Sequence, residues 1–208
     1  MYYLIKRYRT WILFGTVSTV SIALWLMTLS GSVSSMYQFF PILGVLAWTT
    51  MWVHYVASSI GKPANSKRFA TWTGHIVLLF IVIHPSIFLV QRFLDTGLLP
   101  PESYVSYVGS YRAWAVVIAI AALVTFLLYD VLKHFRSKLI ARGIWPYVGL
   151  LQACAMAAIF IHGLTLGASM NSSYFMLWWI FLGVLLVPCL VLQVIRDFKV
   201  SDRTKTEV

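Results

Sequence analysis

Long uncharged runs of hydrophobic residues, separated by short basic clusters, are the dominant pattern along this chain. A mostly apolar run of about 18 residues or more is long enough to cross a bilayer as a helix. The pattern therefore predicts an all-α polytopic membrane protein. No Asp, Glu, Lys or Arg occurs between Arg9 and Lys62, between Arg68 and Arg92, between Arg112 and Asp130, or between Arg142 and Arg196.

The runs divide into six predicted membrane-spanning helices. The 53 uncharged residues that precede Arg196 are too many for one span, and the turn-forming segment 167–173 is the natural break. The first run is too long for a signal peptide and lacks a convincing cleavage site, so we interpret it as a retained helix. Residues 1–208 are treated as a single domain with spans at about 11–30, 38–59, 70–92, 113–132, 146–167 and 175–195.

Prolines refine these spans. Pro41 and Pro146 are expected in a first helical turn, where a missing N–H is not needed. Pro85 and Pro188 fall inside spans and predict kinks. Kinks are tolerated in membranes where neighbouring helices cover the freed carbonyl groups.

Composition agrees with a membrane protein. Hydrophobic residues make up 60% of the chain and charged residues 11%, and the mean hydropathy is +0.82. The net charge of +10 does not predict nucleic-acid binding, because the basic residues flank apolar runs instead of forming one face. Cys154 and Cys189 show no metal-ligand or redox spacing and are interpreted as two small buried hydrophobic side chains.

The basic residues also predict orientation. Cytoplasmic loops of membrane proteins are enriched in Lys and Arg. We therefore expect both termini in the cytoplasm and the protein in the plasma or inner membrane. Of the 16 Lys and Arg residues, fourteen lie on the predicted cytoplasmic side, and only Arg92 and Arg112 lie on the other: Lys6, Arg7, Arg9, Lys62, Lys67, Arg68, Lys133, Arg136, Lys138, Arg142, Arg196, Lys199, Arg203 and Lys205 are the fourteen.

Two histidines, His84 and His162, lie inside spans three and five. An ionisable ring in hydrocarbon is costly, so a functional role is the default expectation. His84 lies 8 residues before Arg92 and His162 lies 5 before Gly167. At about 1.5 Å per residue, both rings lie on the order of 8–12 Å from the outer ends of their helices. Two imidazoles at equal depth are what axial ligation of a b-type haem requires; the alternative is that each ring only hydrogen-bonds to a neighbouring helix.

Other residues could support such a haem. Arg92 and Arg112 stand at the outer end, where haem propionates need cationic partners, although arginines at an interface also simply snorkel. Gly74, Gly149 and Gly163 could admit a porphyrin edge, although close helix packing explains such glycines equally well.

Two further histidines, His75 and His54, lie nearer the cytoplasm. Nine helical residues separate His75 from His84, which places the two rings about 180° apart on the helix. They therefore should not face one cavity. His75 could pair with His54, could bind a quinone or flavin head group, or could be a buried hydrogen-bond donor.

Two segments carry a family resemblance: RFATWTGHIVLLFIVIHP, which ends at Pro85, and YVGLLQACAMAAIFIHGLTLG, which ends at Gly167. They resemble the third and fifth helices of the ferric reductase-like transmembrane domain family, which includes metalloreductase membrane domains and the haem-binding subunit of the methionine sulfoxide reductase system. The resemblance covers nearly the whole chain. It implies a six-helix bundle with cytoplasmic termini that uses haem to move electrons.

The chain departs from that family at the cytoplasmic side. Many members carry a second histidine on each helix, 13 or 14 residues away, for a second haem. The corresponding positions here are Ala70 or Thr71 and Val148 or Gly149, none of which can ligate iron. One haem is therefore expected, and a second through an unusual ligand such as His75 stays open. Larger members also append a flavin- and nicotinamide-binding domain; with 13 residues after Ile195, we expect none in this chain.

These observations predict a b-type cytochrome, the membrane electron-transfer component of an oxidoreductase. A separate flavoprotein or quinol would supply electrons, and a soluble partner could dock at the outer connection 95–111. A quinone or flavin near His54, His75 and Gln152 would bridge roughly 20 Å of helix on the cytoplasmic side. The competing interpretation is a membrane scaffold or small-solute permease without haem. A cytochrome of the ascorbate-reducing type would need histidines on spans four and six, which have none.

Overall fold

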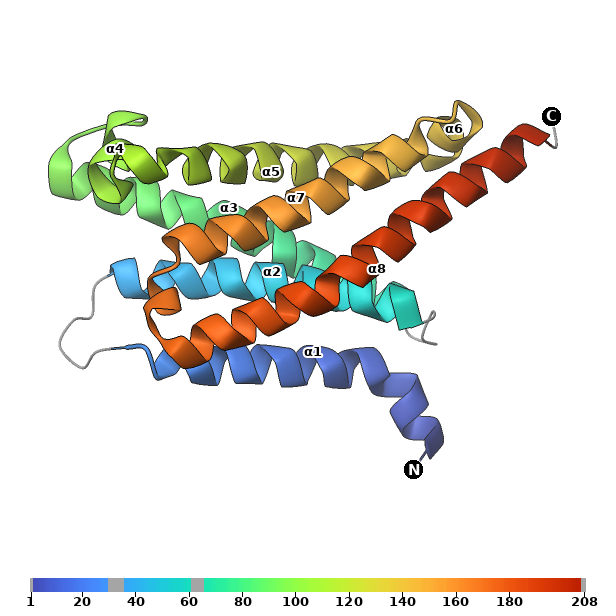
Figure 1. The fold of residues 1–208 in the computed structure, drawn as a ribbon, viewed down its shortest axis with the longest axis horizontal. Coiled ribbons are helices and arrows are strands. Elements are labelled where there is room, and N and C mark those ends of the chain that lie inside the picture. Colours follow the sequence, from blue (N-terminus) through green and yellow to red (C-terminus); the bar gives the residue numbers. More distant parts are fainter. Residues whose placement is uncertain (1, 30–35, 61–65, 207–208) are drawn as a thin grey trace.

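The computed structural model describes residues 2–29, 36–60 and 66–206, and within these ranges all regular structure is helical. Long apolar segments form helices because a helix satisfies its own backbone hydrogen bonds in lipid. Figure 1 shows the helices running roughly along one common axis. The elements are α1 Tyr2–Leu26, α2 Met36–Ile60, α3 Ser66–Thr96, α4 Glu102–Val108, η1 Ser110–Arg112, α5 Ala113–Leu132, η2 Lys133–Phe135, α6 Arg136–Ala141, α7 Trp145–Leu166, η3 Ala168–Asn171 and α8 Ser173–Thr206.

Six helices in the described part of the chain (α1, α2, α3, α5, α7 and α8) are long and apolar enough to cross a membrane. The prediction of an all-α, multi-pass membrane protein is confirmed at this level. Several helices continue beyond the predicted spans: α3 ends at Thr96 and α8 continues to Thr206. Both termini lie at the same end of the bundle (Figure 1). We call this the N/C end and the other the α4 end.

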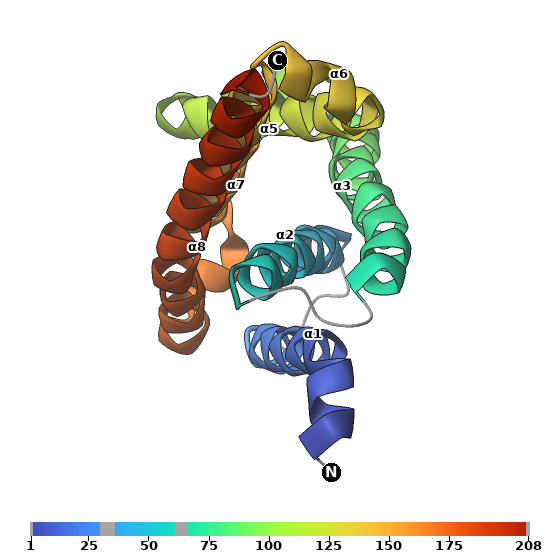
Figure 2. The same ribbon diagram turned by 90° about the vertical axis from the view of Figure 1, so that its right-hand side faces the viewer.

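The helices pack as two antiparallel hairpins with α1 and α8 on their flanks. Helix α2 packs against α3, and α5 packs against α7. Helix α8 contacts both α7 and α2, and α1 lies along α2. Figure 2 shows α2 inside the bundle, between α3 and the α7–α8 side. The site described below lies between the two hairpins.

Buried tryptophans join these helices. Trp48 and Trp52 of α2 and Trp179 of α8 are almost completely buried. The indole N–H of Trp48 donates to the carbonyl of Met156 at 3.3 Å, and that of Trp52 donates to the carbonyl of Leu182 at 2.7 Å. A buried indole needs such a partner because an unpaired N–H is costly away from water. These bonds fix how α2 sits against α7 and α8.

Two expectations about individual residues are corrected. Pro41 lies inside α2, not in its first turn, because the helix begins at Met36. The extra turn is held by tertiary contacts, since the rings of Tyr37 and Phe40 pack on Phe88. Cys154 is exposed on the surface of α7 and is therefore not a buried side chain.

The other three prolines lie where they were expected. Pro146 occupies the first turn of α7. Pro85 lies inside α3 and Pro188 inside α8.

The connection between α3 and α5 forms local structure of its own. It contains α4 and η1, which were not predicted as elements. Gly109 ends α4 with φ of 78°, a conformation that residues with a side chain rarely adopt. Helix α4 lies at the end of the bundle opposite the termini (Figure 1), next to the site described below.

Candidate functional site

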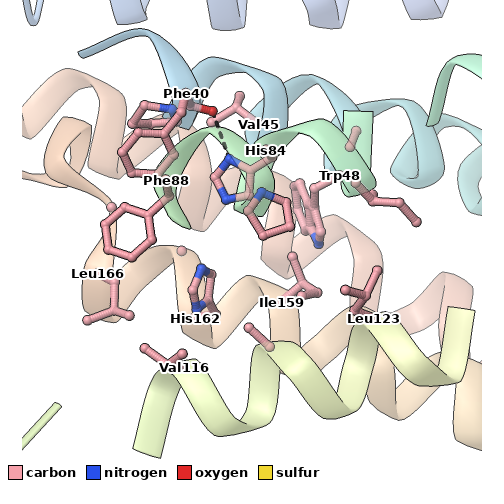
Figure 3. A pocket seen from close by; sticks show the side chains of 18 of the residues that line it. Phe40, Val45, Trp48, His84, Phe88, Val116, Leu123, Ile159, His162 and Leu166 are labelled. Atoms are coloured by element: carbon pink, nitrogen blue, oxygen red, sulfur yellow. Dashed lines mark hydrogen bonds between the residues drawn. The ribbon is translucent and has the colours of Figure 1, made fainter. Parts of the chain in front are cut away.

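A cavity of about 210 Å³ lies between the two hairpins near the α4 end. Its walls come from α2, α3, α5 and α7, and α4, η3 and α8 contribute to its end. Almost all of the lining is aliphatic or aromatic. The polar exceptions are His84, His162, Ser169 and the hydroxyls of Tyr104 and Tyr107. Figure 3 shows the two histidines among these apolar side chains.

His84 enters the cavity from α3. Its Nδ1 lies 2.7 Å from the carbonyl oxygen of Phe40 on α2. A carbonyl can only accept a hydrogen bond, so Nδ1 must be the donor and must carry the proton. In the neutral ring, Nε2 then carries a free lone pair. None of the described residues hydrogen-bonds to that nitrogen.

His162 repeats this arrangement from α7. Its Nδ1 lies 3.0 Å from the carbonyl oxygen of Ala115 on α5. By the same argument Nδ1 is the donor and Nε2 is left free. The two rings enter one cavity from opposite walls (Figure 3). The structure therefore brings together the two histidines that the depth argument paired.

These two imidazoles are the side chains of the cavity lining that are best suited to ligate a metal. Among residues 2–29, 36–60 and 66–206, no cluster of three or more His, Cys, Asp or Glu residues could hold a bare metal ion. A metal held here would have two protein ligands and would need its other ligands from a second molecule. An Nδ1–H bound to a carbonyl is the usual outer-shell contact of a metal-ligating histidine, because it fixes the ring and its tautomer.

Gly44 makes room for the His84 ring. A Cβ added to Gly44 would lie 3.0 Å from Cε1 of His84 and 3.2 Å from Nε2. Gly44 stands one helical turn after Phe40, whose carbonyl holds the same ring. Gly44 was not among the glycines selected from the sequence. It follows Phe40 by four residues, and this spacing places both on one face of α2.

The glycines selected from the sequence have other roles. Gly74 has no atom within 4 Å of an added Cβ, and at Gly149 the added Cβ would meet the carboxylate of Asp197. Neither lines the cavity. Gly163 does line it, but its added Cβ would meet the ring of Trp179 at 2.7 Å. The three glycines differ because they lie on different faces of their helices, and the amino-acid composition does not predict which face meets which neighbour.

Aromatic rings close the α4 end of the cavity. Phe88 of α3 stacks on Tyr104 at 5.7 Å between ring centroids, and Tyr37 of α2 stacks on Tyr107 at 5.6 Å. The Tyr37 hydroxyl donates to the carboxylate of Asp95. Burial raises the pKa of Tyr104 and that of Tyr107, so both hydroxyls stay protonated at neutral pH.

The two outer arginines occupy different surroundings. Arg92 lies behind the aromatic cap: its Nη2 donates to Ser106 Oγ at 2.6 Å, and its guanidinium lies 5.4 Å from the ring centre of Tyr107. Its Nε is buried without a hydrogen-bond partner. Arg112 is exposed in η1. Neither arginine lines the cavity itself.

His54 and His75 do not form a pair, and neither lines the cavity between the hairpins. Thr73 Oγ1 donates to the carbonyl of Phe69, so it accepts a hydrogen bond from Nε2 of His54 at 2.7 Å. His75 is exposed, and its Nδ1 bonds to the carbonyl of Thr71 on its own helix. The structure therefore does not bring His54 and His75 together, and a quinone or flavin site at either ring stays a prediction.

Comparison with family models found no match, and comparisons with curated proteins and with solved structures found none either. The chemistry of this cavity is thus inferred from its own geometry.

Proposed function

We propose that this chain is a b-type haem protein of the membrane that passes electrons to an acceptor at its outer face. One observation carries the proposal: two imidazoles present free Nε2 atoms to the same apolar cavity, each held by an Nδ1–H bond to a neighbouring helix. Such rings are suited to axial ligation of a haem iron.

The residues present fit a haem. His84 and His162 supply the two nitrogens, and the apolar walls suit the faces of a porphyrin. Gly44 leaves space for the His84 ring, which would have to shift if a Cβ stood 3.0 Å from its Cε1. A polar solute would need a lining of hydrogen-bonding groups, which these walls lack; this counts against a permease.

The residues of the chain would hold a haem and keep water away from it. A bound haem supplies one-electron oxidation and reduction at its iron. His84 and His162 hold their rings in one orientation because each Nδ1–H is fixed by a carbonyl. Both rings can stay neutral throughout, so the transfer needs no proton at the histidines. Apolar walls exclude water, and Arg92 places a positive charge near the outer end of the cavity.

The two ends of the bundle would lie on opposite sides of the membrane and meet different partners. The N/C end carries the basic clusters and faces the cytoplasm of a cell membrane. The cavity then lies toward the outer face, beneath α4, where a soluble acceptor would dock. A flavoprotein or a quinol supplies the electrons. In this role the chain only passes electrons and does not itself convert a substrate. It would therefore be the membrane component of an oxidoreductase.

The direct test is the haem content of the purified protein. We expect about one haem per chain and a spectrum that changes on reduction with dithionite. His84→Ala and His162→Ala should each lower the haem content, whereas His75→Ala, which alters an exposed ring on the same helix as His84, should leave it unchanged. Absence of haem from the wild-type protein would favour the scaffold interpretation and contradict the proposal.

A further inference from the structure

The cavity that holds the two histidines is not enclosed equally on all sides. Its wall toward α2 and α8 is tightly packed, since Trp48 and Phe175 are 0% exposed and Trp179 is 2% exposed. Helices α5 and α7 pack along each other and close a second side, and α2 and α3 close a third. Two sides remain: the α4 end and the side between α3 and α5.

Helices α3 and α5 face each other across the cavity. In the described part of the chain they are not among the helix pairs that pack closely, and Figure 1 shows α3 diverging from α5 toward the N/C end. Each helix presents one face to the cavity, because its lining residues recur at spacings of three and four. These residues are Ile81, His84, Pro85 and Phe88 on α3, and Val116, Ala119, Ile120, Leu123 and Phe126 on α5.

Exposed lining residues show where the cavity meets its surroundings. Among the lining residues whose exposure the structure describes, Ile120 is 47% exposed and Tyr107 is 43% exposed. Tyr107 is held at the α4 end, where its ring stacks on Tyr37 at 5.6 Å and lies 5.4 Å from the guanidinium of Arg92. Ile120 is on the cavity face of α5, and nearly half of it is nevertheless exposed. The cavity therefore opens between α3 and α5.

This opening lies at the depth of the lipid hydrocarbon. Ile120 is seven residues from Ala113, where α5 begins, which is about 10 Å along the helix. The hydrocarbon core of a bilayer is about 30 Å thick, so this depth is below the headgroups. The outer surface of the same helices is apolar as well: Val117 is 64% exposed, Val124 49% and Val82 46%.

We infer that ligands reach His84 and His162 sideways from the bilayer, between α3 and α5, and not from the outer aqueous side. The ligand class is a mostly apolar molecule dissolved in the membrane, because both the opening and the walls are apolar. Lipid acyl chains cover the opening and give way when such a ligand enters. The inference goes beyond the proposed function, since it concerns the route to the histidines and holds for any apolar ligand. A haem would be inserted from the membrane.

A lipid-soluble carbene reagent tests the opening without any need for haem. The probe is trifluoromethyl-iodophenyl diazirine, activated by light in vesicles that contain the full chain produced without haem. Mass spectrometry locates the labelled residues. We expect labelling of Ile159, which lines the cavity on α7, and of Val184, which is 65% exposed on α8. Val53, which is 0% exposed and outside the lining, should stay unlabelled.

A bulky ring placed in the opening should close it. Ile120→Trp should lower the labelling of Ile159 severalfold and leave that of Val184 unchanged. The matched control is Val117→Trp, which places the same ring at an exposed position of α5 outside the cavity lining. Equal labelling of Ile159 in the two variants would overturn the inference.

Haem uptake from the membrane compares the two routes. Hemin is supplied in vesicles, and its uptake by the chain produced without haem is followed by absorption. Ile120→Trp should slow uptake severalfold relative to Val117→Trp. Ser106→Ala removes the acceptor of the Arg92 hydrogen bond at the α4 end and should leave the rate unchanged. Faster uptake in Ser106→Ala, with no effect of Ile120→Trp, would place the entrance at the α4 end and overturn the inference.

Failure of this inference can be distinguished from failure of the proposed function. Labelling of Ile159 that falls in Ile120→Trp, in a protein that takes up no hemin, would support the opening and refute the proposed function. Hemin uptake by a protein whose Ile159 labelling is the same in Ile120→Trp and Val117→Trp would overturn the opening and leave the proposed function standing.

Discussion

The two helical hairpins of this protein present a histidine in the same way. In each hairpin the second helix carries the histidine, and the first helix supplies a carbonyl near the α4 end: Phe40 for His84 and Ala115 for His162. Four residues after each carbonyl stands a small cavity-lining residue, Gly44 on α2 and Ala119 on α5. In both hairpins a carbonyl sets the direction of the ring, and on α2 the small residue one turn later leaves space for it.

The hairpins differ in how closely they hold the ring. The His84 ring is in contact with Gly44 and lies 5.2 Å from the ring centre of Phe40, so its position is fixed by packing as well as by its hydrogen bond. On the other hairpin, the glycine beside the histidine, Gly163, faces Trp179 and not the imidazole. The comparison teaches that His84 is placed by its own hairpin, whereas the α7 wall near His162 depends on α8.

Replacing either histidine should have the largest effect on haem content. The two losses should be equal if the two hairpins are equivalent. His84→Ala and His162→Ala should each lower haem content about tenfold or more, because one axial ligand is lost. Haem content per chain, measured on the purified protein, checks this. A large loss in only one variant would show that a single hairpin holds the cofactor.

Crowding Gly44 should separate the hairpins. Gly44→Val adds atoms where even a Cβ stands 3.0 Å from the His84 ring, so the ring must move and haem content should fall severalfold. Gly74→Val is the matched control, because an added Cβ there meets no atom within 4 Å. Equal haem content in the two variants would contradict the close fit around His84.

Crowding Gly163 should affect stability more than ligation. In Gly163→Ala the new Cβ would stand 2.7 Å from Trp179, so α7 and α8 must separate slightly. Overpacking of this kind costs about 1–3 kcal/mol. A lower midpoint of thermal unfolding in detergent, with haem content near that of the wild type, is the expected result. A loss of haem without a loss of stability would show that Gly163 shapes the site directly.

The smallest effect is expected at the outer arginines. Arg92 contacts the aromatic cap, whereas Arg112 is exposed. Arg92→Gln removes a charge that favours the reduced iron and should lower its reduction potential by the equivalent of about 1 kcal/mol. Arg112→Gln should change it less, because an exposed charge is screened. Potentiometric titration of both variants measures the difference, and the reverse order would contradict these assignments.

The sequence predicted the helices better than their faces. Uncharged runs located the six long helices, and equal depth located His84 and His162 as neighbours across one cavity. Nothing in the local sequence distinguishes Gly74, which faces open space, from Gly44, which faces the imidazole. That difference arises when α2 and α3 pack. Trp48 and Trp52 share one face of α2, and the carbonyls that accept their hydrogen bonds, those of Met156 on α7 and Leu182 on α8, lie far along the chain.

The state of the iron tests the central claim most directly. Electron paramagnetic resonance of the oxidised, haem-loaded protein should show a six-coordinate, low-spin ferric signal. His84→Ala and His162→Ala should each convert the remaining haem to a high-spin signal, and His54→Ala and His75→Ala should not. A high-spin signal in the wild-type protein, or a low-spin signal that survives either of the first two replacements, would contradict ligation by these two histidines.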